Sequence, residues 1–174
     1  PNLTWEDSRA RHLVATWKRQ GFGSEIYMLT GCPLHPMYAS AKIAWWREHQ
    51  PDLFRRITTF VSVKAFVIQR LTGTLLEDQA TVSGSGLLNI DKLDWEDSVL
   101  SLAGISRNQL PPVVDPTLSI ESIRPEISRH LRWRRLHVAS NILIMVLLEV
   151  QAITGSSDLL EIPLSWQKPT IYRC

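Results

Sequence analysis

Three residue types suited to chemistry alternate near the start of the chain, as Trp5, Asp7 and Arg9. An indole face packs against the C–H side of a sugar, while a carboxylate and a guanidinium hydrogen-bond its hydroxyls or a substrate carboxylate. The planar guanidinium suits a carboxylate because it donates two parallel N–H groups. From the spacing alone, a structural alternative is favoured. In that alternative Asp7 or Ser8 caps the helix that follows, and Arg9 is solvated.

The histidines and serines define no second site by their spacing. His35 lies in a loop with two prolines, and no other histidine falls within loop or helical reach of it, so we expect no metal site. His12 and His49 are expected on helix surfaces. The run Ser83-Gly84-Ser85-Gly86 has no neighbouring base and lacks the Gly-Lys-Ser/Thr ending of a phosphate loop. We interpret that run as an ordinary turn.

Composition narrows the class of protein. The chain has 174 residues, of which 44% are hydrophobic and 21% charged, and this balance is typical of one globular domain rather than a disordered chain. A net charge of +2 predicts neither nucleic acid nor an acidic membrane as a partner. The basic stretch 129–135 contains one tryptophan, which favours an exposed helix end over a single-strand binding site. The apolar run 142–148 is far shorter than the roughly 20 residues that span a bilayer.

The number of cysteines bears on the cellular location, and the first residue bears on whether the chain is part of a longer protein. Cys32 and Cys174 are too few for a disulfide framework, so we expect a cytoplasmic protein. Pro1 stands where an initiator methionine is usual. We therefore expect either that the start has been removed or that the chain is a piece of something longer.

Helices must position most of these residues. Hydrophobic periodicity, together with glycine and proline punctuation, predicts helices over 8–20, 24–28, 39–49, 52–56, 64–71 and 95–103. We expect Gly31, Gly73 and Gly104 to end three of them, and Asp94 to cap the last. A brief strand is predicted over 60–63.

Eight short motifs follow one another between residues 5 and 116. They are Trp5-x-Asp7-x-Arg9; Thr30-Gly31 with Pro33-Leu34-His35-Pro36-Met37; Ser40-x-Lys42-x-x-Trp45; Glu48 to Asp52; Lys64 with Leu71-Thr72-Gly73; Asp78 with Ser83 to Leu87; Leu93-Asp94-Trp95 with Ala103-Gly104-Ile105; and Leu110-Pro111. In this order they resemble the FGGY family of carbohydrate kinases, and most closely its gluconate kinases and xylulokinases.

The resemblance implies an α/β fold, namely part of an actin-like, ribonuclease-H-like ATPase domain. The part present here would be mainly α-helical with a few short strands. Residues 1–125 would form a partial N-terminal domain that covers the sugar site. Residues 126–174 would be a divergent tail, frameshifted or disordered, because the resemblance ends abruptly there. Translating the other two reading frames tests the frameshift hypothesis.

The resemblance also implies a substrate site of six residues: Trp5, Asp7, Arg9, His35, Met37 and Asp78. The indole would form a wall, and the carboxylate and guanidinium beside it would contact or support the hydroxyls. His35 and Met37 would lie on a loop facing the same pocket. Asp78 would be a structural or pocket-edge carboxylate.

Catalytic groups of the family are expected to be missing from this chain. The family uses ATP and Mg²⁺, and an Asp in a Gly-x-x-Asp-Gly segment acts as the base. The nearest stretch here is Val138-Ala139-Ser140-Asn141, so Asn141 would replace the base, and an amide cannot accept the proton. The family's phosphate-binding hairpin would precede Pro1. We therefore expect no catalytic, cofactor-binding or metal-binding residue here.

Two functions compete at this point. The first is part of an ATP-dependent carbohydrate kinase that phosphorylates a hydroxyl of a sugar or a gluconate-like sugar acid. The second is a catalytically inactive remnant, or a sugar-binding fragment that lacks the ATP site. A helical adaptor is a third and more distant alternative.

Overall fold

The computed structural model describes residues 6–120, 123–125, 128–129 and 136–138. Its α-helices are α1 (Arg11–Arg19), α2 (Phe22–Thr30), α3 (Ala39–His49), α4 (Pro51–Phe54), α5 (Val63–Thr72), α6 (Gln79–Val82) and α7 (Asp97–Ala103). Two short 3₁₀ turns, η1 (Ser83–Ser85) and η2 (Arg107–Gln109), accompany them. The fold expected from the sequence, helical with a few short strands, is confirmed for the described part.

Within the described residues, six strands of two residues each pair segments of the chain. They are β1 (Glu77–Asp78), β2 (Leu88–Asn89), β3 (Asp94–Trp95), β4 (Val113–Val114), β5 (Ser119–Ile120) and β6 (Leu136–His137). Strand β1 pairs with β4 in parallel, while β2 pairs with β3 and β5 with β6 in antiparallel fashion. Each pair joins parts of the chain without building a larger sheet.

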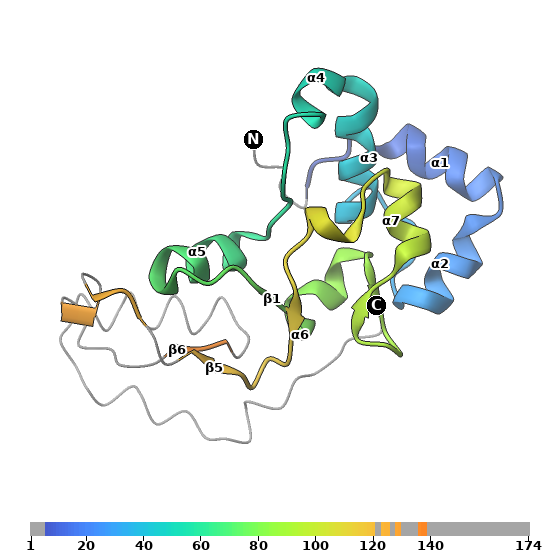
Figure 1. Cartoon of the computed structure of the whole chain (residues 1–174). Helices are drawn as coiled ribbons and strands as arrows, with labels where there is room; N and C mark the ends of the chain where they lie inside the picture. Colours follow the sequence, from blue (N-terminus) through green and yellow to red (C-terminus); the bar gives the residue numbers. More distant parts are fainter. Residues whose placement is uncertain (1–5, 121–122, 126–127, 130–135, 139–174) are drawn as a thin grey trace.

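The apolar side chains of the described residues form two clusters. The larger one joins α1, α2, α3, α7 and the β2–β3 hairpin through residues such as Trp17, Ile43, Leu88 and Leu100. The smaller one joins α5 to β5 through Ile68, Leu76, Ile120 and Val138. Figure 1 shows the four helices of the larger cluster grouped at one end, with α5, β5 and β6 at the other and β1 between them.

Helix α3 follows the predicted bounds, and glycines end three helices as expected. Gly31, Gly73 and Gly104 follow α2, α5 and α7 with φ values of 70°, 84° and 85°. These left-handed conformations favour glycine because a Cβ atom would crowd the backbone.

Several predicted boundaries at the N-terminal side of helices are wrong. Helix α1 begins at Arg11 after Ala10, which makes no side-chain cap, so neither Asp7 nor Ser8 caps it. Helix α2 begins at Phe22 after Gly21, two residues before the predicted start at Ser24. Left-handed Gly21, at φ 88°, lets the chain turn from one helix directly into the next.

Two further local predictions are wrong because a residue that was not expected to cap a helix does so. Glu96, not Asp94, caps α7, because its side chain accepts the Ser98 N–H while Asp94 pairs in β3. The strand predicted over 60–63 does not form, because Ser62 accepts the Ala65 N–H and starts α5. A polar side chain that caps a helix overrides the β preference of its apolar neighbours.

Among the described residues, every helix is too short or too polar to cross a bilayer.

Candidate functional site

Asp7 and Arg9 form a joined pair in front of α1. The Arg9 Nε–H lies 3.1 Å from Asp7 Oδ1 and 2.9 Å from Oδ2, and Nη2 lies 2.6 Å from Oδ2. The Arg9 backbone N–H also donates to Oδ1, at 3.1 Å. On its other side the guanidinium lies over the Trp45 ring of α3, with Cζ 4.5 Å from the ring centroid. We call Asp7, Arg9 and Trp45 the Arg9 corner.

The corner is charged and rigidly oriented. Hydrogen bonds from Arg9 hold the pKa of Asp7 below its ordinary value, and the nearby charge of Lys42 lowers it further. The same hydrogen bonds raise the pKa of Arg9. Lys42 lies on α3 with 9% of its surface exposed, and its burial lowers its own pKa while the Asp7 charge opposes that shift. A carboxylate and two cations therefore face one small region.

His35 and Met37 lie on the loop before α3. The Met37 backbone N–H donates to His35 Nδ1 at 3.2 Å, and the His35 ring meets Tyr38 edge-on with centroids 6.4 Å apart. Both side chains are solvent-exposed, Met37 to 39%. The loop packs against the segment that follows Asp78, because Cys32 Sγ donates to the Ser83 carbonyl at 3.3 Å and Gly86 lies against Tyr38.

Asp78 is completely buried and its oxygens are occupied. Lys64 Nζ lies 2.5 Å from Oδ2, and the Thr81 hydroxyl donates to the same oxygen at 2.8 Å. The Thr81 N–H donates to Oδ1 at 3.1 Å, so Asp78 also caps α6. This arrangement ties α5 to α6 through a charge pair, which the spacing of 14 residues between Lys64 and Asp78 gave no reason to expect.

Two residues predicted for the site lie outside the described part of the chain. Trp5 belongs to the wall expected beside Asp7, and Asn141 is the residue expected in place of the family's base. The structure brings Asp7 and Arg9 together and places Lys42 near them, while His35 and Met37 share one loop.

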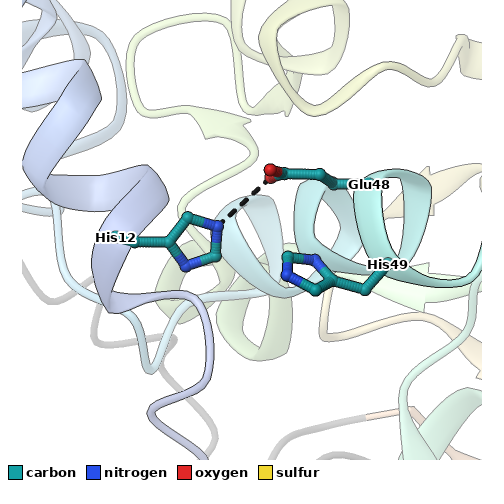
Figure 2. Close-up of side chains that lie close together, drawn as sticks. All are labelled: His12, Glu48 and His49. Atoms are coloured by element: carbon teal, nitrogen blue, oxygen red, sulfur yellow. Dashed lines mark hydrogen bonds and ion pairs between the residues drawn. The ribbon is translucent and has the colours of Figure 1, made fainter.

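Three exposed side chains that the sequence did not connect meet between α1 and α3. His12, Glu48 and His49 each offer a ligand atom within 4.8 Å of the others, a proximity that their spacing in the sequence did not predict. Figure 2 shows the two rings side by side with the carboxylate of Glu48 near both. A separation of 36 residues between His12 and Glu48 hides this contact from any spacing rule.

Among the described residues, the one cluster of three possible metal ligands is poorly suited to Mg²⁺. Mg²⁺ prefers an octahedral set of oxygen ligands, whereas the cluster of His12, Glu48 and His49 is rich in imidazole. No other group of three such ligands occurs in the described part of the chain. We therefore derive no phosphoryl-transfer step from these residues.

The same architecture occurs in solved sugar kinases. A gluconate kinase from Lactobacillus acidophilus superposes with a TM-score of 0.69 and 34% identity, covering 73% of this chain and 26% of that one. A xylulose kinase from the same organism matches with the same figures. The described structure is thus a part of the actin-like ATPase fold of sugar kinases.

Sequence similarity assigns the family. Residues 1–133 match the N-terminal domain of the FGGY family of carbohydrate kinases, and the chain belongs to that family. A gluconokinase from Bacillus subtilis (strain 168) is 30% identical over 128 residues, and a xylulose kinase from Escherichia coli (strain K12) is 26% identical over 129. These stretches cover 74% of this chain in both cases, but only 25% and 26% of the relatives. The chain spans about a quarter of the length of the curated relatives that it matches.

Proposed function

We propose that this chain is part of an ATP-dependent carbohydrate kinase that phosphorylates a hydroxyl of a sugar or a gluconate-like sugar acid. The observation that carries the proposal is the Arg9 corner, where a carboxylate orients a guanidinium over an indole. Similarity to a gluconokinase and a xylulose kinase supports the substrate class.

Arg9 has donors available for a ligand. A guanidinium carries five N–H groups, and Asp7 engages the Nε–H and one Nη2–H. Half of the Arg9 side chain is exposed. Because Asp7 fixes the plane of the guanidinium, the remaining N–H groups are preorganised to bind a sugar carboxylate or hydroxyls at low entropic cost.

The other residues predicted for the site take different places in this proposal. Trp5 would extend the apolar wall begun by Trp45, and His35 and Met37 would face the sugar from their loop. Asp78 would act indirectly, because its buried carboxylate holds Lys64 in place and caps α6. ATP and Mg²⁺ would bind mainly to parts of the whole kinase beyond the described residues. We also propose a cytoplasmic location, because two cysteines are too few for a disulfide framework.

The competing function is a sugar-binding remnant without phosphoryl transfer. It is supported by Asn141, which would stand where the resemblance places the family's base. Both functions predict sugar binding, and only the first predicts turnover.

The test combines binding and turnover on the purified chain. We expect gluconate to raise the melting temperature more than xylulose or glycerol does, because only gluconate offers a carboxylate to Arg9. We expect Arg9→Ala to weaken gluconate binding by about tenfold or more, since a hydrogen bond to a charged group contributes about 1.5–3 kcal/mol. The gluconate affinity of Arg9→Lys should lie between those of the parent and Arg9→Ala, because lysine keeps the positive charge but cannot donate two parallel N–H groups.

Arg55→Ala is the matched control. Arg55 pairs with Asp52 at the surface, as Arg9 pairs with Asp7, but lies at the end of α4. Its substitution should leave gluconate binding unchanged. Absence of sugar binding, or equal binding by Arg9→Ala, contradicts the assigned site. ADP release with any of the three sugars excludes the remnant, whereas binding without ADP release excludes kinase activity for this chain alone.

A further inference from the structure

His12, Glu48 and His49 form an exposed cluster on two packed helices. His12 lies in the first turn of α1, and Glu48 and His49 are the last two residues of α3. His12 Nε2 lies 3.2 Å from Glu48 Oε2, and the two imidazole centroids are 5.2 Å apart with planes at 70° (Figure 2). We call these three residues the α1–α3 cluster.

Backbone carbonyls hold both rings in one orientation. His12 Nδ1 lies 3.2 Å from the Arg9 carbonyl oxygen, and His49 Nδ1 lies 3.2 Å from the Trp45 carbonyl oxygen. A carbonyl oxygen only accepts, so each Nδ1 carries a proton. Nε2 of His49 is then open to a cation, whereas Nε2 of His12 shares a further proton with Glu48 Oε2, which an ion would displace. Metal-binding histidines are typically oriented by just such a bond from the other ring nitrogen. This second feature is independent of the proximity of the three side chains.

Stacking fixes the His49 ring further. Its plane lies 9° from that of Trp45, with centroids 4.7 Å apart. Rotation about the terminal torsion would therefore lose both the stack and the hydrogen bond to the Trp45 carbonyl. A His49 side chain held in this way loses little conformational entropy when it binds an ion.

The geometry points to a surface site for a divalent first-row transition metal ion, with zinc as the probe, bound by Nε2 of His12, Nε2 of His49 and a carboxylate oxygen of Glu48. Ligand atoms on one tetrahedral zinc are about 3.4 Å apart, as bond lengths of about 2.0–2.1 Å require. The separation of 3.2 Å between His12 Nε2 and Glu48 Oε2 already matches that value. One possible ligand atom of each of the three residues lies within 4.8 Å of those of the other two, so small side-chain movements bring three ligands to one ion.

Two nitrogens and one oxygen favour zinc-like ions over Mg²⁺ or Ca²⁺, which prefer oxygens alone. Three protein ligands leave the fourth position to water. On binding, the ion takes the place of the proton shared between His12 Nε2 and Glu48 Oε2, and that proton passes to solvent.

The bound ion would join α1 to the end of α3 beside the Arg9 corner. His12 is bonded to the Arg9 carbonyl, and Trp45 lies between Arg9 and His49. The site is independent of the proposed kinase function, because it needs neither sugar nor ATP.

Calorimetric titration of the metal-free chain with Zn²⁺ tests the site, with Co²⁺ absorption as a second readout of tetrahedral coordination. We expect one zinc per chain and a higher melting temperature when zinc is present. His12→Gln and His49→Gln should each weaken binding by at least about tenfold and abolish the Co²⁺ band. Glu48→Gln should weaken binding as well, because it removes the anionic ligand.

His35→Gln is the matched control, since His35 is also exposed but lies outside the cluster. It should bind zinc as the parent does. All three ligand side chains are exposed, so their substitutions should leave the metal-free melting temperature nearly unchanged. The site is refuted if zinc does not bind, if His12→Gln or His49→Gln binds as tightly as the parent, or if His35→Gln weakens binding equally.

Discussion

Glu96 shows how a single carboxylate is held in its charged form. Asn89 Nδ2 donates to one of its oxygens at 2.6 Å, and the Ser98 hydroxyl donates to the other at 2.9 Å. These bonds, the one from Asn89 above all, lower the pKa of Glu96 to about 2 from an ordinary value of 4.5. The same side chain caps α7, so its ionisation and the start of that helix are linked.

This pKa shift makes the free energy of unfolding depend on pH. A pKa that is lower in the folded state contributes stability in full above pH 4.5, and that contribution is lost as the pH falls toward 2. We expect the parent to lose about 2–3 kcal/mol from this group over that range. Glu96→Gln should lack this part of the loss. Urea unfolding at a series of pH values measures it, and identical pH profiles for the two proteins would contradict the assignment.

Residue pairs were predictable from the sequence only where the partners are near neighbours. Asp7 and Arg9 are two residues apart and were placed in one motif, and their side chains are in contact. Lys64 and Asp78 stood in separate motifs, and nothing in either motif pairs them. His12 and Glu48 lie on different helices, so only the packing of α1 on α3 brings them together.

At the scale of elements, the turn after α7 depends on glycine. Gly104 has φ 85°, and a Cβ atom built there would collide with the side chain of Arg47. Gly23 lies within α2 and has nothing within 4 Å of the same position. Gly104 therefore has a left-handed backbone and no free space for a Cβ atom, whereas Gly23 lies in a helix and has space for one.

Opposite effects on stability follow for the two glycines. Gly104→Ala should lower the unfolding free energy by at least about 1–2 kcal/mol, because alanine disfavours the left-handed conformation and meets Arg47. Gly23→Ala should raise it by about 0.5–1 kcal/mol, because alanine favours the helix. Urea unfolding of both variants measures the changes. Equal changes of the same sign would show that the backbone conformations differ from those described.

Elements with strong local signals were predictable. Helix α3 has an apolar stripe and a proline two residues after its last residue, and both bounds were predicted correctly. The strand expected at 60–63 fails because Ser62 starts α5. The pairing of β1 with β4 joins residues that are 36 positions apart, and strands of two residues leave no periodicity to detect.

At the scale of the whole molecule, the smaller apolar cluster includes Val138, which comes from a segment late in the sequence. Val138 is 1% exposed among Ile68, Leu76 and Ile120, and its N–H donates to the Leu118 carbonyl at 2.9 Å. We therefore propose a folded unit that includes residues 136–138, beyond the boundary expected at residue 125.

Substitution of two valines tests that extent. Val138→Ala should lower the unfolding free energy of the full chain by about 1–2 kcal/mol, because it removes buried methyl groups from a packed cluster. Val61→Ala, at a position 44% exposed, should change it by less than about 0.5 kcal/mol. Unfolding by urea compares the two. If Val138→Ala costs no more than Val61→Ala, residues 136–138 do not stabilise the fold.

The buried thiol of Cys32 makes the loop before α3 observable in solution. Cys32 is 1% exposed and its sulfur is hydrogen-bonded to the Ser83 carbonyl, so an alkylating reagent reaches it only when the loop separates from η1. In a Cys174→Ser background, the rate of alkylation would count those openings directly. The loop that carries His35 thus contains its own reporter, and slower labelling in the presence of a sugar would register closure without an added probe.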